Sequence, residues 1–505
     1  MRPYSSPKSG RNRYRGMLLD FNERTTRPDR SIFRALLSVR SVNRYPEYGP
    51  VEQAVASYAG VSKDMVLLTN GSDEAIDLIM RVSAGENDRI IIPTPSFSMF
   101  FQSAAIIGAA IVSPSYLENG ACRFPLREIL ATITKTTKLV VLCNPNNPTG
   151  TGISLSDIET ILKNASSTLV MVDEAYQEFS GISAVPLLSR YPNLIITRTF
   201  SKAFGLAGLR IGYVLASPTI IKMLSAIKSP YSVNALAAAA ANAALRRTND
   251  MRSYAAEVMD RSKPLLEAFF LENGVPFFAS RANFLLIAPT NPESVAKKLE
   301  QNGILVRTIK KPEIGCMLRI SIGTIRETKR FIRIYRSAIL PSVRIALIDR
   351  DGTLIYEPQD TFQVNSVDQL RILPGVVKTL RSLMRSRYRL VMITNQDGLG
   401  TNANPEEAFA LVQKALLARL KRYGIVFNRI LVCPHLPNDG CPCRKPKTGL
   451  LRQLGRDRRN ISLMIGDRES DKELATRVRV PFIRMTTNGD MSAAVANADA
   501  YSKNV

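Results

Sequence analysis

The chain has 505 residues, of which 45% are hydrophobic and 22% charged, a balance typical of a globular protein with more than one domain. Its net charge of +25 comes from scattered Lys and Arg residues without a nucleic-acid-binding motif, so we expect no nucleic-acid partner. No apolar run reaches the ~18 residues of a membrane span, and six cysteines in so long a chain exclude a secreted disulfide framework.

The first segment, Met1 to Gly16, is basic and contains no acidic residue. An organelle transit peptide has this composition, but the segment is short and lacks a clear amphipathic pattern. We therefore expect a cytoplasmic protein with a basic N-terminal arm.

From Val66 onward, short β-branched runs alternate with helical patterns, which predicts an α/β fold with a mainly parallel sheet. The predicted buried parallel strands are Val66–Thr69, Arg89–Pro93, Lys138–Cys143, Thr168–Asp173 and Leu194–Thr197. Ligands bind at the carboxyl ends of such strands, and polar motifs follow all five of them. These motifs are Asn70–Glu74, Pro93–Phe97, Asn144–Gly150, Asp173–Tyr176 and Ser201–Lys202.

One lysine, Lys202, lies between hydroxyl residues and a Gly-rich segment that ends at Arg210. A lysine forms a Schiff base with a carbonyl, whereas hydroxyls, backbone N–H groups and an arginine hold a phosphate. Pyridoxal phosphate is the cofactor that needs both. In this hypothesis Asp173 keeps the pyridine nitrogen protonated. The other candidate contacts are Tyr176 and Asn147 at the ring hydroxyl, Phe97 on the ring face, and Ser72, Asp73, Ser201 and Arg210 at the phosphate.

Taken one at a time, these residues have simpler explanations. Asp173 could begin the next helix, Ser72 and Asp73 could cap theirs, Phe97 could belong to the core, and Lys202 could be a solvated surface lysine. The pyridoxal phosphate hypothesis is favoured because five loops carry the required residue types together.

The region from about Pro3 to Leu340 resembles the fold-type-I pyridoxal phosphate aminotransferases, and among them the histidinol-phosphate aminotransferases. The resemblance rests on the motifs above together with Leu19–Glu23 and Asn43–Pro46. It implies that Arg319 binds the α-carboxylate of a glutamate donor. It also implies that Arg307 and Tyr45 hold the substrate phosphate, with Tyr45 coming from the second subunit of a homodimer. Surface or interface packing is the alternative explanation for Arg307 and Tyr45.

From Asp250 to Leu340 the pattern changes to long helices with few strands, which predicts a smaller second lobe. After the short linker Leu340–Val343, a new apolar strand begins at Arg344. We therefore predict an aminotransferase domain over residues 1–340 and a second, Rossmann-like α/β domain over residues 344–505. Further strands are expected at Leu390–Thr394, Ile430–Val432 and Ile461–Gly466.

Two carboxylates, Asp349 and Asp351, follow the first strand of this second domain. Asp349 can attack phosphorus, and Asp351 can protonate the leaving alcohol and then activate water. An Asp–Gly turn is the simpler alternative, but the pattern resembles the haloacid dehalogenase-type phosphatases. That resemblance implies a Mg²⁺ site from Asp349, the Asp351 carbonyl and Asp467. It also implies phosphoryl contacts from Thr394, Asn395 and Lys445.

Three cysteines surround the only histidine of the chain. Their residue types and spacing fit a closed tetrahedral site, so we expect a structural Zn²⁺ that fixes Arg444 and Lys445 beside the aspartates. The expected ligands are Cys433, His435, Cys441 and Cys443.

Residues from about Arg344 to Val505 resemble the histidinol-phosphate phosphatases, through Glu357–Ser366, Thr394–Thr401 and Cys443–Leu450. The combined hypothesis is a bifunctional histidine-biosynthesis enzyme that transaminates imidazole-acetol phosphate with glutamate and then dephosphorylates histidinol phosphate. One alternative is another aminotransferase, for example of aromatic amino acids, fused to a heptose bisphosphate-type phosphatase. The non-enzymatic alternative is an inactive, basic nucleic-acid-binding protein.

Overall fold

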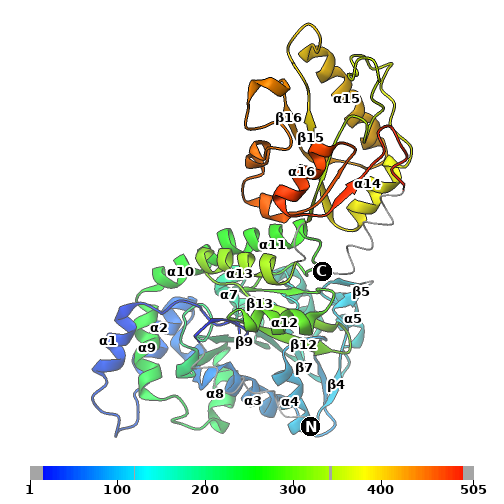
Figure 1. Cartoon of the computed structure of the whole chain (residues 1–505). Coiled ribbons are helices and arrows are strands. Elements are labelled where there is room, and N and C mark those ends of the chain that lie inside the picture. The colour runs from blue at the N-terminus through cyan, green and yellow to red at the C-terminus, as the bar shows by residue number, and fades with distance from the viewer. Residues whose placement is uncertain (1–14, 119, 341–343, 493–505) are drawn as a thin grey trace. The chain divides into compact units, whose positions relative to one another are not determined.

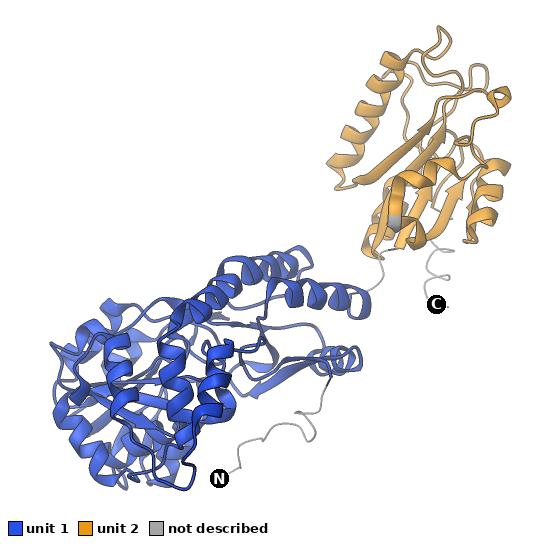
Figure 2. Cartoon of the chain, turned by 90° about the vertical axis from the view of Figure 1, so that its left-hand side faces the viewer, with its two compact units in different colours: residues 1–340 blue, residues 341–505 orange. Residues whose placement is uncertain are grey.

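The computed structural model describes residues 15–118, 120–340 and 344–492. The chain divides into two compact units, residues 1–340 and 341–505 (Figure 2). Most of the predicted basic arm, and residues 341–343 of the predicted linker, lie outside the described residues. No helix in the described part of the chain is both long and apolar enough to cross a bilayer.

The main sheet of unit 1 has seven strands with helices on both faces (Figure 1). One face packs on α3 (Gly71–Ser83), α4 (Ser98–Ile106) and α8 (Pro218–Ile227), and the other on α2 (Gly49–Ala59), α6 (Leu155–Asn164) and α9 (Ala235–Leu245). The strand order is β2 (Val66–Thr69), β10 (Gly212–Ala216), β9 (Leu194–Thr199), β8 (Leu169–Asp173), β7 (Thr137–Cys143), β3 (Arg89–Ile91) and β4 (Ala110–Val112). The five strands from β9 to β4 are parallel, which confirms the predicted fold class.

Val66–Thr69 runs in the same direction as the five parallel strands, as predicted, but in the described part of the chain it pairs with none of them. Among the described residues, β2 pairs only with β10, and β10 is antiparallel to both β2 and β9. The segment between β9 and β10 reverses the chain, so β10 returns along β9 and separates it from β2. The apolar run of β2 is buried throughout, a pattern that does not depend on strand direction.

The smaller lobe of unit 1 contains a four-stranded sheet. The strand order is β1 (Met17–Leu19), β12 (Ile304–Lys311), β13 (Gly315–Ser321) and β11 (Phe284–Ile287). β1 runs parallel to β12, with Met17 opposite Ile304. The N-terminal segment therefore joins the last part of unit 1, and it brings residues 20–23 to the carboxyl edge of the main sheet.

The last helix of this lobe begins with a sequence-encoded cap. α13 (Ile325–Ala338) starts at a capping box: Glu327 Oε2 accepts from the Thr324 N–H at 2.9 Å, and Thr324 Oγ1 accepts from the Glu327 N–H at 3.3 Å. Its buried Phe331 and Tyr335 pack on Phe270 of α11 (Lys263–Glu272). α12 (Pro292–Gln301) packs on β12 and β13.

Unit 2 is a five-stranded parallel sheet flanked by α14 (Val376–Arg385), α15 (Glu406–Arg422) and α16 (Glu469–Val478). The strand order is β16 (Phe427–Cys433), β15 (Tyr388–Asn395), β14 (Arg344–Ile348), β17 (Ile461–Gly466) and β18 (Phe482–Arg484). All neighbouring pairs are parallel. Because β15, β14 and β17 are neighbours, the residues that follow them meet at one edge of the sheet.

Candidate active sites

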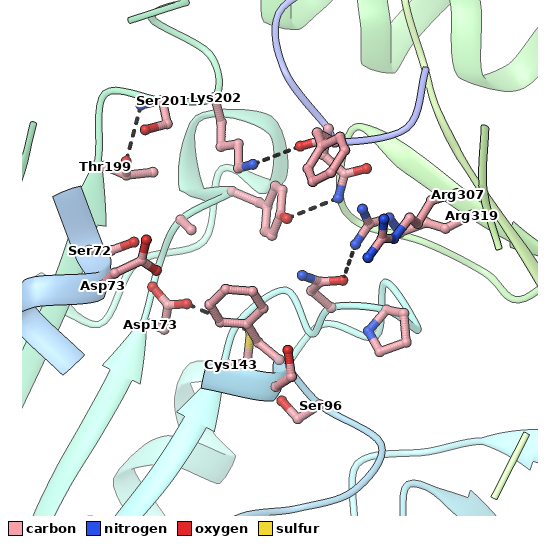
Figure 3. A pocket seen from close by; sticks show the side chains of 18 of the residues that line it. Ser72, Asp73, Ser96, Cys143, Asp173, Thr199, Ser201, Lys202, Arg307 and Arg319 are labelled. Carbon is pink, nitrogen blue, oxygen red and sulfur yellow. Dashed lines mark hydrogen bonds between the residues drawn. The ribbon is translucent and has the colours of Figure 1, made fainter. Parts of the chain in front are cut away.

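A cavity of about 1010 Å³ opens at the carboxyl edge of the main sheet of unit 1 (Figure 3). It is reached by residues from both lobes, because β12 and β13 line the side opposite the main sheet. The predicted residues that line it are Ser72, Asp73, Phe97, Asn147, Asp173, Tyr176, Ser201, Lys202, Arg210, Arg307 and Arg319.

Lys202 follows β9 and points into this cavity (Figure 3). Its Nζ donates a hydrogen bond to the Phe21 carbonyl at 2.9 Å and lies 5.8 Å from the centre of the Tyr176 ring. Removal of the ammonium from water, and then the nearby Arg319 guanidinium, lower the pKa of Lys202 to about 8. A useful fraction of the amine is therefore uncharged near neutral pH, as a nucleophile requires.

The N-terminus of α3 and Arg210 form a cradle for an anion. Ser72 and Asp73 occupy the first turn, where backbone N–H groups have no intrahelical acceptor. Arg210 Nη2 lies 3.0 Å from Asp73 and its Nη1 lies 3.4 Å from Ser201 Oγ. A Cβ atom on Gly71 would lie 2.4 Å from Arg210 Nη2, so glycine is needed for this close approach. The donor set fits the phosphate of pyridoxal phosphate.

Asp173 ends β8 and is 4% exposed. It accepts a hydrogen bond from Thr197 Oγ1 at 2.9 Å, and burial raises its pKa to about 6. The helix that follows begins after Tyr176, so Asp173 is not its N-cap and the simpler explanation does not apply. A buried carboxylate at the base of the cavity fits the ring nitrogen of the cofactor.

The remaining wall is a hydrogen-bond network between the two lobes. Arg319 Nη1 donates to Asn147 Oδ1 at 2.6 Å, and Asn22 Nδ2 donates to the Tyr176 hydroxyl at 3.0 Å. Asn22 adopts a left-handed backbone, with φ of 55°, a conformation that asparagine tolerates well. No role was predicted for Asn22 from the sequence, although it lies within the Leu19–Glu23 motif.

Two predicted substrate contacts differ in their placement. Arg307 lines the cavity, with its guanidinium 5.2 Å from the Phe21 ring centre, and it lies opposite Arg319 in the β12–β13 register. Tyr45 does not line this cavity. It is 75% exposed and stacks on Tyr231, with 4.0 Å between ring centres.

The site of unit 2 is a cluster of buried carboxylates at the edge of its sheet. Asp349 follows β14, Asp467 follows β17, and Asp471 lies in α16. One oxygen of each lies within 4.8 Å of the others, a donor set that fits Mg²⁺. Lys445 binds Asp349 and lies 2.7 Å from Asp471. Asp471 was not predicted from the sequence. Its position four residues after Asp467 could have indicated that it belongs to the same cluster.

Burial and the neighbouring charges shift the pKa values of this cluster in opposite directions. Burial, together with Asp471 and Asp467, raises the pKa of Asp349 well above its usual value, although Lys445 opposes this shift. Burial alone would lower the pKa of Lys445, but the attraction of Asp349 and Asp471 raises it. Three buried carboxylates with one lysine leave a negative excess, which a divalent cation would neutralise.

Asp351 lies apart from the three-carboxylate cluster. Its carboxylate accepts hydrogen bonds from Gln396 Nε2 at 2.6 Å, Arg350 Nη1 at 2.8 Å and Thr394 Oγ1 at 3.3 Å. Gln396 and Arg350 were not predicted. Asn395 contacts Lys445 rather than Asp351, and its Oδ1 accepts from the Lys445 N–H at 3.0 Å.

The cysteines and the histidine of unit 2 come together at the end of β16 and in the loop that follows it. Cys433 Sγ lies 3.3 Å from Cys443 Sγ and 3.7 Å from Cys441 Sγ, and His435 Nδ1 lies 3.1 Å from Cys443 Sγ. Two sulfurs on a tetrahedral zinc with ~2.3 Å bonds lie about 3.8 Å apart, so the donor set fits Zn²⁺. The Arg444 N–H donates to Cys441 Sγ at 3.3 Å, and the Arg444 side chain pairs with Asp397.

Two family models match the chain, one in each of its two units. The family model described as aminotransferase class I and II matches residues 14–334. The model described as polynucleotide kinase 3 phosphatase matches residues 344–482.

Individual relatives match unit 1. The chain is 37% identical over 323 residues to a histidinol-phosphate aminotransferase of Desulfitobacterium hafniense, covering 62% of this chain and 89% of the relative. It is 38% identical over 323 residues to histidinol-phosphate aminotransferase 1 of Haemophilus influenzae, covering 62% and 90%. The structure of histidinol-phosphate aminotransferase from Sinorhizobium meliloti with pyridoxal-5'-phosphate superposes with a TM-score of 0.60 at 23% identity, covering 66% of this chain and 96% of that one. This last likeness shows the fold.

Proposed function

We infer the function from the premise that the chain belongs to the class I and II aminotransferase family, whose model covers more than half of its length. Pyridoxal phosphate is the cofactor of this family's site, and the unit 1 cavity offers the lysine, carboxylate and anion cradle that it requires. The finer proposal concerns the substrates and the second reaction.

In unit 1, the proposed steps use residues of the cavity wall. Pyridoxal phosphate, when bound, supplies an aldehyde and an electron-withdrawing ring that make the proton on the substrate α-carbon removable. The Lys202 amine takes that proton and returns it at the neighbouring position. Asp173, ionised above about pH 6, holds the ring-nitrogen proton. Arg319 holds the substrate anion with its planar fork, and Phe97 covers the ring face.

In unit 2, the arrangement supports hydrolysis of a phosphate monoester. The Asp349 carboxylate attacks phosphorus, the bond to the leaving oxygen breaks, and Asp351 gives that oxygen a proton. Water then attacks the aspartyl phosphate, Asp351 takes its proton, and inorganic phosphate leaves. Asp349, Asp467 and the Asp351 carbonyl would hold Mg²⁺, whose charge would stabilise the phosphoryl oxygens. Lys445, Thr394 and Asn395 hold the phosphoryl group in this proposal.

The zinc loop is proposed to be structural. Cys433, His435, Cys441 and Cys443 supply four donors, so no position is left for a substrate. The loop continues directly into Arg444 and Lys445, and it therefore sets the position of the lysine that binds Asp349.

An exposed apolar face supports the proposal that unit 1 forms a homodimer. α1 (Arg30–Ser38) packs on α9 at the left edge of unit 1 in Figure 1. The exposed large side chains on and near α1 are Phe33, Leu37, Val42, Tyr45 and Tyr231, with 43–86% of their surface accessible. A second copy on this face would cover them and place Tyr45 next to the partner's cavity.

We propose that the chain transaminates imidazole-acetol phosphate with glutamate and then hydrolyses the histidinol phosphate formed. The observation that carries this proposal is one chain holding an aminotransferase site, with relatives named for histidinol phosphate, and a carboxylate site suited to phosphate monoesters. The alternatives are an aminotransferase of aromatic amino acids and a phosphatase for heptose bisphosphates or for the 3′-phosphates that the second family model names.

A coupled assay separates these proposals. The purified full chain, loaded with pyridoxal phosphate, is supplied with imidazole-acetol phosphate, glutamate and Mg²⁺, and 2-oxoglutarate, histidinol and phosphate are measured. We expect all three products. Transamination without phosphate release would overturn the second half, and a matched panel of phenylpyruvate, heptose bisphosphate and a 3′-phosphorylated oligonucleotide would identify the alternative substrates.

A further inference from the structure

We propose that Lys311 binds an anionic group of the substrates in the unit 1 cavity, beyond the contacts assigned to Arg307 and Arg319. The inference rests on the proposed function, because it concerns the substrates of the transamination. It makes Lys311 a specificity-determining residue for that reaction.

The β12 strand places Lys311 on the cavity side. All five residues from Arg307 to Lys311 line the cavity, and because side chains alternate along a strand, Arg307 and Lys311 share one face. Arg307 lies directly opposite Arg319 on β13, and both line the cavity. Lys311, which also lines it, lies four residues further along, about 13 Å at 3.3 Å per residue. The strand therefore presents cations at two separate places along the cavity.

The ammonium of Lys311 differs from its neighbour in what it contacts. Lys310 also lines the cavity, but its Nζ forms an ion pair with Glu293 at 2.5 Å, which raises the pKa of Lys310. Lys311 Nζ lies 5.7 Å from the centre of the Phe101 ring, and Phe101 lines the cavity as well. Within residues 15–118, 120–340 and 344–492, no carboxylate forms an ion pair with Lys311. Its charge is thus available to a ligand of the cavity.

The turn that carries Lys311 is held in place at the mouth of the cavity. Thr94 Oγ1, in the loop after β3, donates to Glu313 Oε1 at 2.5 Å. That loop continues into Phe97 and α4, which form the facing wall. The contact joins the β12–β13 turn to the large lobe, so Lys311 is positioned by both lobes.

The chemistry of transamination explains why a second anion contact is useful. Both substrates pass through the same cavity, and each carries more than one negative charge. Glutamate has a second carboxylate away from the reacting carbon, and the other substrate has a phosphate. A compact ammonium accepts either anion, whereas the planar fork of Arg319 matches one carboxylate in a bidentate pair.

The test compares Lys311→Gln, Lys311→Arg and the matched control Lys310→Gln in the pyridoxal phosphate-loaded full chain. Steady-state KM values are measured separately for glutamate and for imidazole-acetol phosphate. Calorimetry measures the Kd of glutarate and of inorganic phosphate, probes that need no turnover. We expect Lys311→Gln to raise KM and the matching Kd by about ten- to hundredfold for at least one anion, the scale of a charge-assisted hydrogen bond. Lys311→Arg should restore most of the loss.

The arms of the experiment identify the source of the anion. A rise confined to glutamate and glutarate assigns the distal carboxylate, and a rise confined to the phosphorylated substrate and phosphate assigns the phosphate. Equal values for Lys311→Gln and Lys310→Gln would overturn the inference. If wild-type protein turns over neither substrate, the proposed function fails, while the calorimetric comparison still decides the role of Lys311.

Discussion

Each unit contains one lysine at the centre of its site, and the two lysines have opposite electrostatic surroundings. Lys202 is removed from water beside Arg319, and its pKa falls to about 8. Lys445 is 4% exposed between Asp349 and Asp471, whose charges raise its pKa despite burial. A lowered pKa suits an amine that must react and move protons, and a raised pKa suits a fixed positive charge.

The two sites also differ in size. The Lys202 site is a cavity of about 1010 Å³, which has room for a cofactor together with a substrate. In the Lys445 site the three carboxylate oxygens lie within 4.8 Å of one another. Removal from water acts to lower the pKa of both lysines, so the charges beside them, rather than burial alone, explain why their pKa values move in opposite directions.

The largest effect is expected from a substitution that removes the proposed nucleophile of unit 2 and leaves unit 1 unchanged. Asp349→Asn should reduce phosphate release by at least about 10⁵-fold, the scale on which other hydrolases respond to the loss of their nucleophile. Transamination, measured as 2-oxoglutarate formation by the same preparation, should change less than about twofold. Retention of phosphatase activity would show that Asp349 does not attack phosphorus.

The reciprocal variant is Lys202→Ala. Loss of its acid–base role should lower the rate of transamination by about 10²–10⁴-fold, and loss of cofactor attachment should abolish the corresponding absorbance band. Lys222→Ala, in the exposed part of α8, is the matched control with normal activity. An unchanged phosphatase rate in Lys202→Ala confirms that the two sites are chemically independent.

Removal of the proposed zinc should weaken only the unit 2 site. Cys443→Ser disturbs the loop that continues into Lys445, and we expect a 10–100-fold loss of phosphatase activity, as is typical when the support of a site is altered. Metal analysis by mass spectrometry should show about one zinc fewer per chain. Cys316→Ser, a half-buried cysteine in unit 1, should change neither zinc content nor phosphatase activity.

The smallest effect concerns the pH dependence of cofactor attachment. The uncharged fraction of Lys202 should rise from about 9% at pH 7 to about 91% at pH 9, because its pKa is about 8. The rate at which the apoprotein binds pyridoxal phosphate covalently should therefore rise about tenfold and then level off. A rate that still rises steeply above pH 9 would mean that burial and Arg319 do not lower this pKa.

Sequence patterns predicted the α/β class and the main-sheet strands that precede site residues, but not β12 and β13, which carry Arg307 and Arg319. The main-sheet strands are buried, β-branched and followed by polar loops, so period and position were sufficient. The pairing partners of the strands were not predictable in the same way. The burial of Val66–Thr69 does not depend on whether its neighbour is parallel. Met17–Leu19 has three residues, too few for its sequence to predict that it pairs with β12.

The side chains that were missed share a physical cause. The contacts of these side chains are with residues outside their own motifs. Asn22 binds Tyr176, and Asp471 pairs with Lys445. Gln396 was missed in the same way. Their types are common in loops and helix starts, and only the folded chain brings them to a site. Tyr45 was predicted to contact substrate, but within its own chain it lies on an exposed face, which the dimer proposal would explain.

The pairing of β1 with β12 sets the order in which the protein can mature during synthesis. The Asn22 N–H binds Ser321 Oγ at 2.8 Å, a contact between residues 299 positions apart. At 5–20 residues per second, a ribosome needs about 15–60 s to make that stretch. The N-terminal strand must wait unpaired for this interval, and the Lys202 cavity closes only when nearly all of unit 1 has emerged. Every strand pairing of unit 2 lies downstream of that point, so the transaminating site can be complete before the phosphatase sheet has begun to form.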